Sequence, residues 1–510
     1  MKTLNSTRPR PAARSMVLRV LATTLFLSFS LTCAVSVLGS QPGTAETLLP
    51  LVQFGEVVFG SIGAPGEVVE YTFAANAGDV ILIRASRDTG DLWPRIQLRG
   101  PGGDLLRDEH SPVHIELTVK LLRGGTHRIQ VSDGFDEEGV GTYRLYLQRL
   151  NDAGASTPLS YGHTAGGMIA QAAEMDAFTV SAEEGDIILT RVSGDPDSGD
   201  LWPEVRLYDP AGELLNKKHD PSHAEFTTNL PARYYAFLPA VLKARGFLAA
   251  GKPGTATGAS YLATRSGTYM VLVGDGFNGT LTGPYGLYIQ RLNLPGNTSG
   301  LSFGELHAST IAQTADMDAY TFAGSAGDKV LVGISRVSGD LHSEIRLYDP
   351  AGSLINTAKD ATHVEATSSL PVTGTYALLV GDGFWGSGTG DYHLYLQRLN
   401  NPENATPLSF GETVSGAILQ AGEMDTYAFS AAGGDQVRVA MSRSSGSSLW
   451  PEVRLYDPGG AIIDTDSDST SAEIIQTLSA GGTYSILCAG GLNATSTGAY
   501  DLQVEKLSSQ

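Results

Sequence analysis

The chain has 510 residues, of which 61 are glycine, 42% are hydrophobic and only 17% are charged. This balance excludes an intrinsically disordered polyanion, which combines few apolar residues with dense charge, and a long coiled coil, which is rich in Ala, Glu, Lys, Leu and Arg. The formal net charge of −20 repels phosphate backbones, so we expect no nucleic-acid partner.

The first 45 residues carry the features of an export signal. Five basic residues and no acidic residue precede or flank an apolar run over 20–39, and small residues follow. We expect a secretory signal peptide that is cleaved after Gly39 or Ala45. The apolar run of about 20 residues is also long enough to span a bilayer as a helix, so an uncleaved anchor is the alternative. The sequence thus predicts a protein that is secreted or held at the cell surface.

The chain contains two cysteines, Cys33 and Cys488. Cys33 lies within the export signal, so we expect the exported chain to hold one thiol and no internal disulfide. Cys488 stands in the apolar stretch 484–488, which predicts a small buried hydrophobic side chain rather than a reactive thiol.

The rest of the chain repeats one unit four times. Asp-Leu-Trp-Pro at 91–94 returns at 200–203, as Ser-Leu-Trp-Pro at 448–451, and in degraded form at 340–343. The repeat is about 108 residues long, and the second copy holds about 33 additional residues. Alternating polar and apolar residues between regularly spaced turns are typical of a β-sandwich. We predict an all-β protein of four tandem sandwiches without a large shared core, over 50–151, 157–295, 300–401 and 406–508.

Four sequence features recur in the same order within the copies. They are Leu-Ser-Phe-Gly at 301–304 and 408–411, the strand Gly-Glu-Met-Asp-x-Tyr-x-Phe at 422–429, an Ala-Gly-Asp turn, and a closing Gly-x-Tyr-x-Leu strand. By these features, about 450 residues of the chain resemble tandem copies of the bacterial pre-peptidase C-terminal domain. The resemblance implies a jelly-roll-like sandwich that serves binding, secretion or solubility rather than catalysis. This sequence departs from the family's usual context because it carries no attached peptidase.

We expect no enzyme and assign no catalytic residue. The sequence has no Gly-x-Ser-x-Gly, no His-Glu-x-x-His and no glycine loop that would cradle a phosphate. His110 and His114 are four residues apart, as are His219 and His223, and on a helix this spacing pairs two zinc ligands. A proline separates the members of each pair and strands flank them, so we expect solvated turn histidines instead.

Each copy places two carboxylates at the start of its first core strand. Clustered carboxylate oxygens at a junction of loop and strand suit Ca²⁺, which accepts six to eight oxygen ligands in loose geometry. The resemblance supports calcium, because related sandwich domains of secreted collagenases bind it near such an Asp-x-Tyr stretch. The alternative is a charged strand edge that opposes aggregation. The candidate calcium ligands are Glu67, Glu70, Glu174, Asp176, Asp316, Asp318, Glu423 and Asp425.

Aromatic residues in the predicted loops are candidate ligand contacts. Exposed aromatic rings stack on sugar rings or hold a peptide. The alternative is that they close the end of each sandwich or pack between neighbouring copies. The six residues are Trp93, Trp202, Trp450, Phe135, Phe277 and Phe384.

The additional residues of the second copy, about 233–265, hold five basic side chains and no acidic one among several aromatic and aliphatic residues. Contact with a membrane surface or an acidic partner is one interpretation, and a loosely packed strand connection is the other.

Taken together, these features predict an exported, non-enzymatic protein that binds an extracellular glycan, a protein or the cell envelope. The alternative is a structural spacer, or an accessory module for a separately encoded secreted peptidase.

Overall fold

The structure is a computed structural model that describes residues 49–152, 154, 156–195, 199–230 and 266–508. The predicted export signal and the basic insertion at 233–265 lie outside the described residues. Among the described residues, no helix is both long and apolar enough to cross a membrane. The described chain is all-β, as the sequence predicted, and its one helical element is the short turn α1 (Gly491–Ala494).

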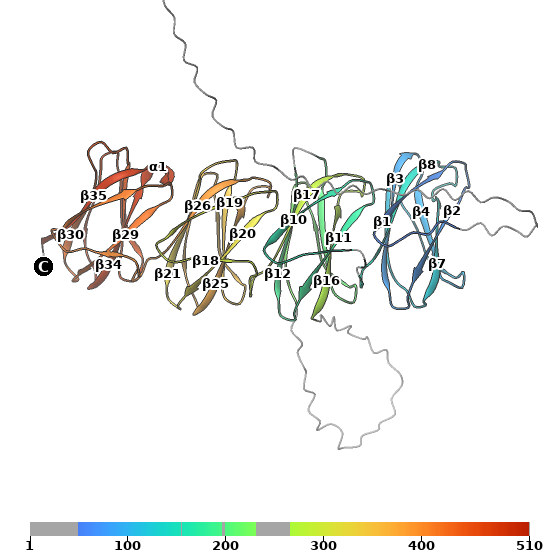
Figure 1. Ribbon diagram of the computed structural model, residues 1–510, viewed down its shortest axis with the longest axis horizontal. Coiled ribbons are helices and arrows are strands. Elements are labelled where there is room, and N and C mark those ends of the chain that lie inside the picture. Colours follow the sequence, from blue (N-terminus) through green and yellow to red (C-terminus); the bar gives the residue numbers. More distant parts are fainter. Residues whose placement is uncertain (1–48, 153, 155, 196–198, 231–265, 509–510) are drawn as a thin grey trace, which may run out of the picture. The chain divides into compact units, whose positions relative to one another are not determined.

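The first repeat folds into two sheets that face each other (Figure 1). Their strand orders are β1-β8-β3-β6 and β2-β7-β4-β5, with antiparallel neighbours. Eight strands in this order form a jelly roll, the fold that the family resemblance implied. The strands are β1 (Glu56–Ile62), β2 (Val69–Ala75), β3 (Val80–Gly90), β4 (Pro94–Arg99), β5 (Leu105–His110), β6 (His114–Lys120), β7 (Gly125–Asp133) and β8 (Gly141–Arg149).

The same strand order returns in the other three sandwiches, each with one short parallel strand added at a sheet edge. The second sandwich consists of β9 (Thr157–Pro158), β10 (His163–Ile169), β11 (Met175–Ala182), β12 (Ile187–Gly194), β13 (Pro203–Tyr208), β14 (Leu214–His219), β15 (His223–Asn229), β16 (Gly267–Asp275) and β17 (Gly283–Arg291). The third consists of β18 (Ser299–Gly300), β19 (Leu306–Ile311), β20 (Met317–Gly324), β21 (Lys329–Arg336), β22 (Ser343–Tyr348), β23 (Leu354–Lys359), β24 (His363–Ser369), β25 (Gly374–Asp382) and β26 (Gly390–Arg398). The fourth consists of β27 (Thr406–Pro407), β28 (Thr413–Ile418), β29 (Met424–Ala431), β30 (Gln436–Arg443), β31 (Pro451–Tyr456), β32 (Ile462–Ser467), β33 (Ser471–Thr477), β34 (Gly482–Gly490) and β35 (Gly498–Ser508).

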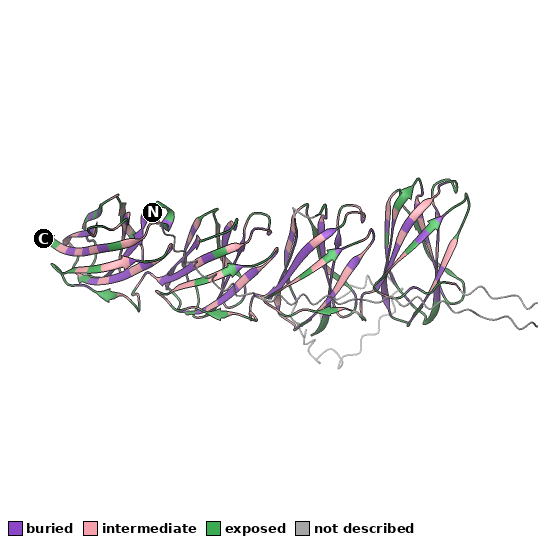
Figure 2. Ribbon diagram, turned by 45° about the horizontal axis from the view of Figure 1, so that its top comes forward, coloured by how far each residue is buried: buried purple, intermediate pink, exposed green. Residues whose placement is uncertain are grey.

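Each sandwich encloses its own hydrophobic core, because successive side chains of a strand point to opposite faces of its sheet. In β6, for example, Ile115, Leu117 and Val119 are buried while the residues between them are partly or fully exposed. This alternation of buried and exposed residues is visible along many strands in Figure 2. Pairs of tyrosines lie within the cores, and the hydroxyl oxygens of Tyr71 and Tyr143 are 3.0 Å apart.

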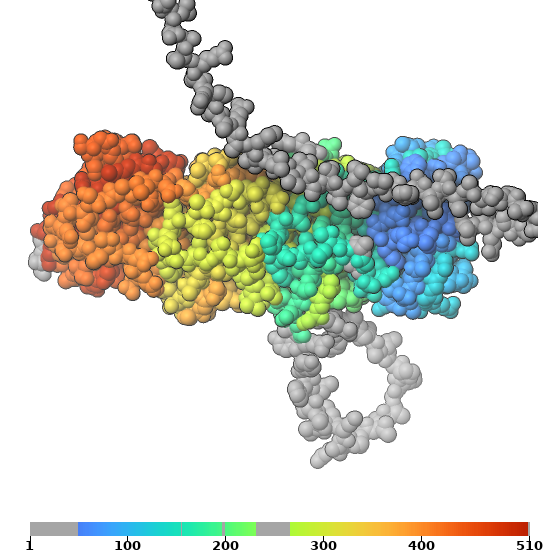
Figure 3. Space-filling view, in the orientation of Figure 1, coloured from blue at the N-terminus to red at the C-terminus, as the bar shows by residue number. Residues whose placement is uncertain are grey.

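Successive sandwiches also share buried apolar contacts, in clusters that are smaller than the four cores. Between the first two, Leu82 and Tyr146 pack against Met175, Tyr208 and Leu272. Similar small clusters join the second sandwich to the third and the third to the fourth. Figure 3 shows the surfaces of adjacent sandwiches in contact. The alternation in the sequence identifies the residues that point outward, but it cannot tell whether water or a neighbouring sandwich covers them.

Cys488 lies on β34 within the core of the fourth sandwich and is fully buried. Burial raises the pKa of its thiol, so the reactive thiolate is strongly disfavoured. We therefore expect a chain of residues 46–510 to show no reaction with Ellman's reagent in native buffer. One thiol per chain should react after unfolding in guanidinium chloride. Rapid labelling of the native protein would contradict this burial.

Candidate binding site at the loop ends of the sandwiches

The jelly-roll topology brings four connections to one end of each sandwich. These are the loops β1–β2, β3–β4, β5–β6 and β7–β8 in the first copy and their equivalents in the others. In the first sandwich, the amide of Gly66 donates to the carbonyl of Glu137 at 2.7 Å, and the amide of Gly134 donates to the carbonyl of Trp93 at 2.8 Å. The acidic pairs, the loop tryptophans, the histidine pairs and the loop phenylalanines all belong to these loops or to the strand ends beside them.

The first carboxylate of each acidic pair closes the turn before its strand. In the second sandwich, one oxygen of Glu174 accepts hydrogen bonds from the amides of Ala170 at 2.7 Å and Gln171 at 2.8 Å. Backbone amides at the same turn donate to the equivalent carboxylates Glu67, Asp316 and Glu423. These four carboxylates therefore compensate amides that would otherwise lack an acceptor.

The second carboxylate accepts a hydrogen bond from a core tyrosine in three of the four copies. Asp176 accepts from Tyr285 at 2.5 Å, and Asp425 accepts from Tyr500 at 2.6 Å. Burial raises the pKa of both aspartates, because it disfavours their charged form. Asp318 accepts from Tyr392 in the same way.

The first copy differs because Val69 occupies this position in its strand. Its second carboxylate, Glu70, is one residue further along the strand and accepts a hydrogen bond from Gln130 at 2.5 Å. The second carboxylate therefore bonds a glutamine in the first copy and a tyrosine in the other three.

These hydrogen bonds bear on the calcium prediction. In the part of the chain that the structure describes, no three His, Cys, Asp or Glu side chains are grouped so that they could hold a metal ion. The calcium prediction stays a prediction, and turn closure is now a concrete alternative role for the same carboxylates.

Thermal unfolding of residues 46–510, with millimolar calcium and with excess chelator, distinguishes the two roles. A ligand that binds only the folded state stabilises it by about 2.7 kcal/mol at a hundredfold excess over its Kd. Calcium coordination predicts a clear rise in Tm, which Glu423→Gln should reduce. Turn closure predicts the same Tm in both buffers, together with a lower Tm for Glu423→Gln in both, because the two amides lose a charged acceptor.

The histidine pairs are split between two environments, which corrects the expectation of solvated turn histidines. His219 is exposed, and its Nδ1 lies 2.8 Å from the carbonyl oxygen of Gly276 in its own sandwich. His114 is partly buried under the second sandwich, with Nδ1 2.7 Å from Ser86 Oγ. Ser86 in turn donates to the carbonyl of Gly279 at 2.9 Å. The neighbouring sandwich, which the spacing of the histidines could not reveal, is the reason for this burial.

A close approach of backbone to His114 explains one glycine of the second sandwich. Gly279 adopts a positive φ of 70°, and a Cβ at this position would lie 2.3 Å from Nδ1 of His114. Only glycine fits both the backbone conformation and the space.

Acid should weaken the packing around these histidines. Burial, assisted by Arg84, lowers the pKa of His114 to about 3, and burial, assisted by Arg191, lowers that of His223 to about 4. The unfolded chain, with histidine near 6.5, therefore binds more protons below that pH, and stability is lost as the pH falls from about 6.5 toward 4. We expect Tm to fall between pH 7 and pH 5, and less steeply in His114→Gln/His223→Gln.

His219→Gln is the matched control for this experiment, since its imidazole is exposed, and it should retain the wild-type slope. Equal slopes for the double variant and the wild type would contradict the role of the buried histidines.

The loop aromatics form stacked or tilted pairs at the sandwich ends. The ring centroids of Trp93 and Phe135 are 4.5 Å apart, and those of Trp202 and Phe277 are 4.7 Å apart. The phenylalanines are 67% and 58% exposed, whereas both tryptophans are partly buried. Trp450 differs, because it packs against the backbone at Gly491.

The third sandwich rearranges this aromatic pair. His342 replaces the tryptophan and stacks on Phe384 at 5.2 Å, and Trp385 follows at 4.2 Å from Phe384. Trp385 is 53% exposed. Trp385 was not among the aromatic contacts predicted from the sequence, although a tryptophan directly after the Asp-Gly-Phe turn occurs in this copy alone and would have marked the position.

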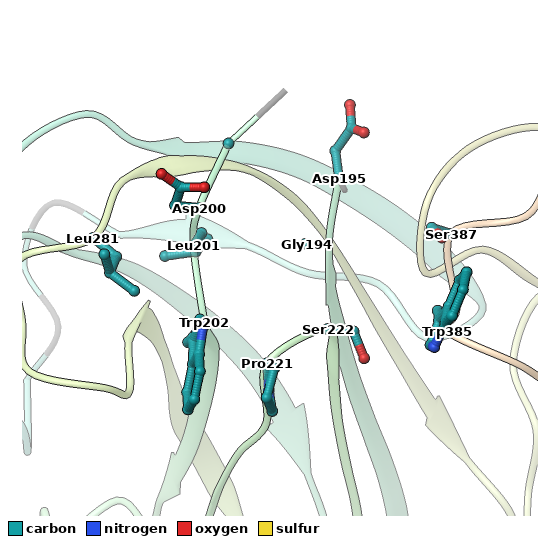
Figure 4. A pocket seen from close by; sticks show the side chains of 11 residues that line it. Gly194, Asp195, Asp200, Leu201, Trp202, Pro221, Ser222, Leu281, Trp385 and Ser387 are labelled. Carbon is teal, nitrogen blue, oxygen red and sulfur yellow. The ribbon is translucent and has the colours of Figure 1, made fainter. Parts of the chain in front are cut away.

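Trp202 and Trp385 line the same groove, although they belong to different sandwiches (Figure 4). The groove has a volume of about 500 Å³. Leu201, Leu281 and Pro221 contribute further apolar surface. The described lining also includes Asp195, Asp200, Ser222 and Ser387. Of the six predicted aromatic contacts, Trp202 is the one that this groove includes.

The junction that carries the groove is held by buried polar contacts. Arg191 of β12 donates to the carbonyl of Asp382 in the third sandwich at 2.6 Å. Arg346 of β22 forms an ion pair with Glu225 of β15 at 2.5 Å. These contacts join the two sandwiches whose loops form the groove.

No protein-family model matches this chain, and no curated protein matches it. The pre-peptidase C-terminal domain of collagenase from Bacillus anthracis is similar in structure over 21% of this chain and 99% of that chain, with 18% identity and a TM-score of 0.18. The CUB1-EGF-CUB2 domain of human MASP-1/3 is similar over 39% of this chain and 99% of that chain, with 7% identity and a TM-score of 0.13.

The M60 catalytic domain with the CBM51-1 and CBM51-2 domains from Clostridium perfringens ZmpB is similar over 64% of this chain, with 8% identity and a TM-score of 0.13. This chain spans 33% of that structure. The first of the three structures belongs to the family that the repeat resembles. Identities and TM-scores at this level transfer no function to this chain.

Proposed function

We propose that this protein is an exported, non-catalytic binding protein whose loop-end aromatic residues contact an extracellular glycan or protein. The observation that carries the proposal is the groove between Trp202 and Trp385. Tryptophan faces stack on sugar rings and on extended peptides, and the groove volume of about 500 Å³ lies in the range of small-ligand sites.

The position of the groove supports this function. Trp385 is half exposed, so its indole is not needed to fill the core of its sandwich. The ion pair between Arg346 and Glu225 links the two sandwiches beside the groove, and such a link lowers the conformational entropy that a ligand would have to remove on binding. A half-exposed tryptophan beside this junction is better explained by ligand contact than by packing.

The repetition of aromatic pairs suggests how binding could be strengthened. Trp93 with Phe135 and Trp202 with Phe277 present related surfaces on successive sandwiches. Several weak sites on one chain gain overall affinity through their effective concentration when the target is a polymer. A polysaccharide or a surface layer offers such a repeating target.

Retention on insoluble polysaccharides and on cell-envelope preparations tests the proposal. We expect Trp202→Ala and Trp385→Ala each to weaken retention by about 30-fold, the effect of removing a central aromatic contact worth about 2 kcal/mol. Tm should remain close to that of the wild type, because neither side chain is fully buried.

Leu122→Ala is the matched control. Leu122 is 86% exposed and lies in the connection between β6 and β7, at the opposite end of the first sandwich. This variant should bind like the wild type. If the tryptophan variants lose stability but the folded protein is retained as before, the aromatic residues are structural and the spacer or accessory function replaces the proposal.

A further inference from the structure

We propose that the contact between sandwiches is a directional recognition surface, and that polar networks on the outward faces of the first and fourth sandwiches prevent any further sandwich from docking there. The side of a sandwich that receives the next one is called the socket, and in the first sandwich it includes Leu82, Arg84, Glu116 and Tyr146. The side that enters it is called the plug, and in the second sandwich it includes Glu204, Arg206, Tyr208 and Leu272.

The plug carries the sequence Glu-x-Arg-x-Tyr on one strand. Arg206 donates two hydrogen bonds to the two carboxylate oxygens of Glu116, at 2.8 and 2.7 Å. Glu204, two residues earlier on the same face of β13, binds the same guanidinium and holds it in place. The motif returns at 344–348 and 452–456, where Arg346 binds Glu225 and Arg454 binds Glu365.

The carboxylate of Glu116 in the socket is held in its charged form by Arg206. Although burial would raise the pKa of Glu116, the hydrogen bonds and charge of Arg206 outweigh it and lower the pKa to about 2. Such a bidentate pair requires correct geometry of both partners, and loss of the socket glutamate leaves the largely buried arginine with only the glutamate of its own strand. The pair therefore favours one orientation of plug on socket.

The socket also contributes an arginine, Arg84, which hydrogen-bonds to the backbone of the plug sandwich. Arg84 donates to the carbonyls of Ala173 at 3.3 Å, Glu174 at 3.2 Å and Asp275 at 3.3 Å. Its side chain is 2% exposed, so it is desolvated by the neighbouring sandwich. Arg191 makes the equivalent contact in the second socket, whereas the third socket has Gly333 at this position.

The fourth sandwich has polar residues where a socket needs apolar ones. By strand register, Arg438 occupies the position of Leu82 in the first sandwich. Gln503 and Glu505 likewise occupy the positions of Tyr146 and Gln148. Arg438 forms ion pairs with Glu473 at 2.9 Å and with Glu505 at 3.1 Å. These three side chains are 30–40% exposed, so water solvates the network.

On its plug side, the first sandwich likewise has other polar residues in place of those that dock into a socket. Arg95, Gln97 and Arg99 replace the Glu, Arg and Tyr of the plug motif. Gln130 takes the position of Leu272, and it bonds both Arg99 and Glu70. Docking a sandwich on either outward face would desolvate these charges without a matching partner, in the way that polar terminal repeats end other repeat proteins.

Glu365 and Glu473 provide a matched pair for the first test, because they occupy the same strand position in the third and fourth sandwiches. In residues 46–510, we expect Glu365→Ala to lower Tm by about 5 °C or more, since the largely buried Arg454 loses its two hydrogen bonds across the junction and keeps only Glu452. We expect Glu473→Ala to change Tm by about 1 °C or less, as for an exposed ion pair. Equal losses for the two variants would overturn the proposal.

The second test removes the polar networks and uses sedimentation velocity on the same chain. One variant opens the socket of the fourth sandwich with Arg438→Leu, Gln503→Tyr and Glu505→Gln. The other opens the plug of the first with Glu70→Ala, Arg95→Glu, Gln97→Arg, Arg99→Tyr and Gln130→Leu. We expect the wild type and each variant alone to be monomeric, and an equimolar mixture of the two folded variants to form heterodimers.

Adding Glu473→Ala to the socket variant should weaken the heterodimer at least tenfold, because the introduced arginine loses its acceptor. Head-to-tail association of the wild type, or a monomeric mixture of two variants that keep the wild-type Tm, would overturn the proposal. If either variant does not fold, the comparison of Glu365→Ala with Glu473→Ala remains decisive.

Discussion

The ion pair between an arginine of one sandwich and a glutamate of its neighbour is the interaction on which the rest of the structure depends. In the first three sandwiches, β3, β12 and β21 lie inside a sheet whose inner face belongs to one core and whose outer face is covered by the next sandwich. Arg84 projects from that outer face and is almost fully buried there, whereas the side chain of Glu116 stays 27% exposed. Arg206 compensates Glu116 with two hydrogen bonds, and Arg84 donates to backbone carbonyls of the second sandwich. A purely apolar contact would fit several relative positions of the two sandwiches, whereas the two hydrogen bonds between Arg206 and Glu116 fit one.

The candidate binding site follows from that register. Trp202 and Trp385 are on different sandwiches, and they line one groove only because the second junction holds the two loops together. The walls of the groove belong to rigid jelly rolls, while the aromatic residues lie on loops, which is a common division of labour in binding proteins. The groove is therefore a property of the assembly of two repeats, and a single repeat would lack it.

The titratable groups at the loop ends have mainly structural partners. Glu174 closes a turn, Asp176 accepts from a core tyrosine, and His114 lies under the neighbouring sandwich. All three are drawn from patterns that resemble metal ligands in sequence. In the structure, each of them has a hydrogen-bond partner within the protein, which is a second explanation of the same patterns.

The sequence by itself determined the repeat, the all-β class, the core-facing positions and the burial of Cys488, because the period of two in a strand and the spacing of turns are local properties. The family resemblance added the jelly-roll topology. The tertiary structure decided which outward residues are covered, where His114 lies and which loop aromatics share a groove. Trp202 and Trp385 are 183 positions apart, and no local pattern reports that residues so distant in the chain line the same groove. The replacement of Leu82 by Arg438 in the last repeat was visible in the sequence, but it acquired meaning only once the structure showed that Leu82 lies against another sandwich.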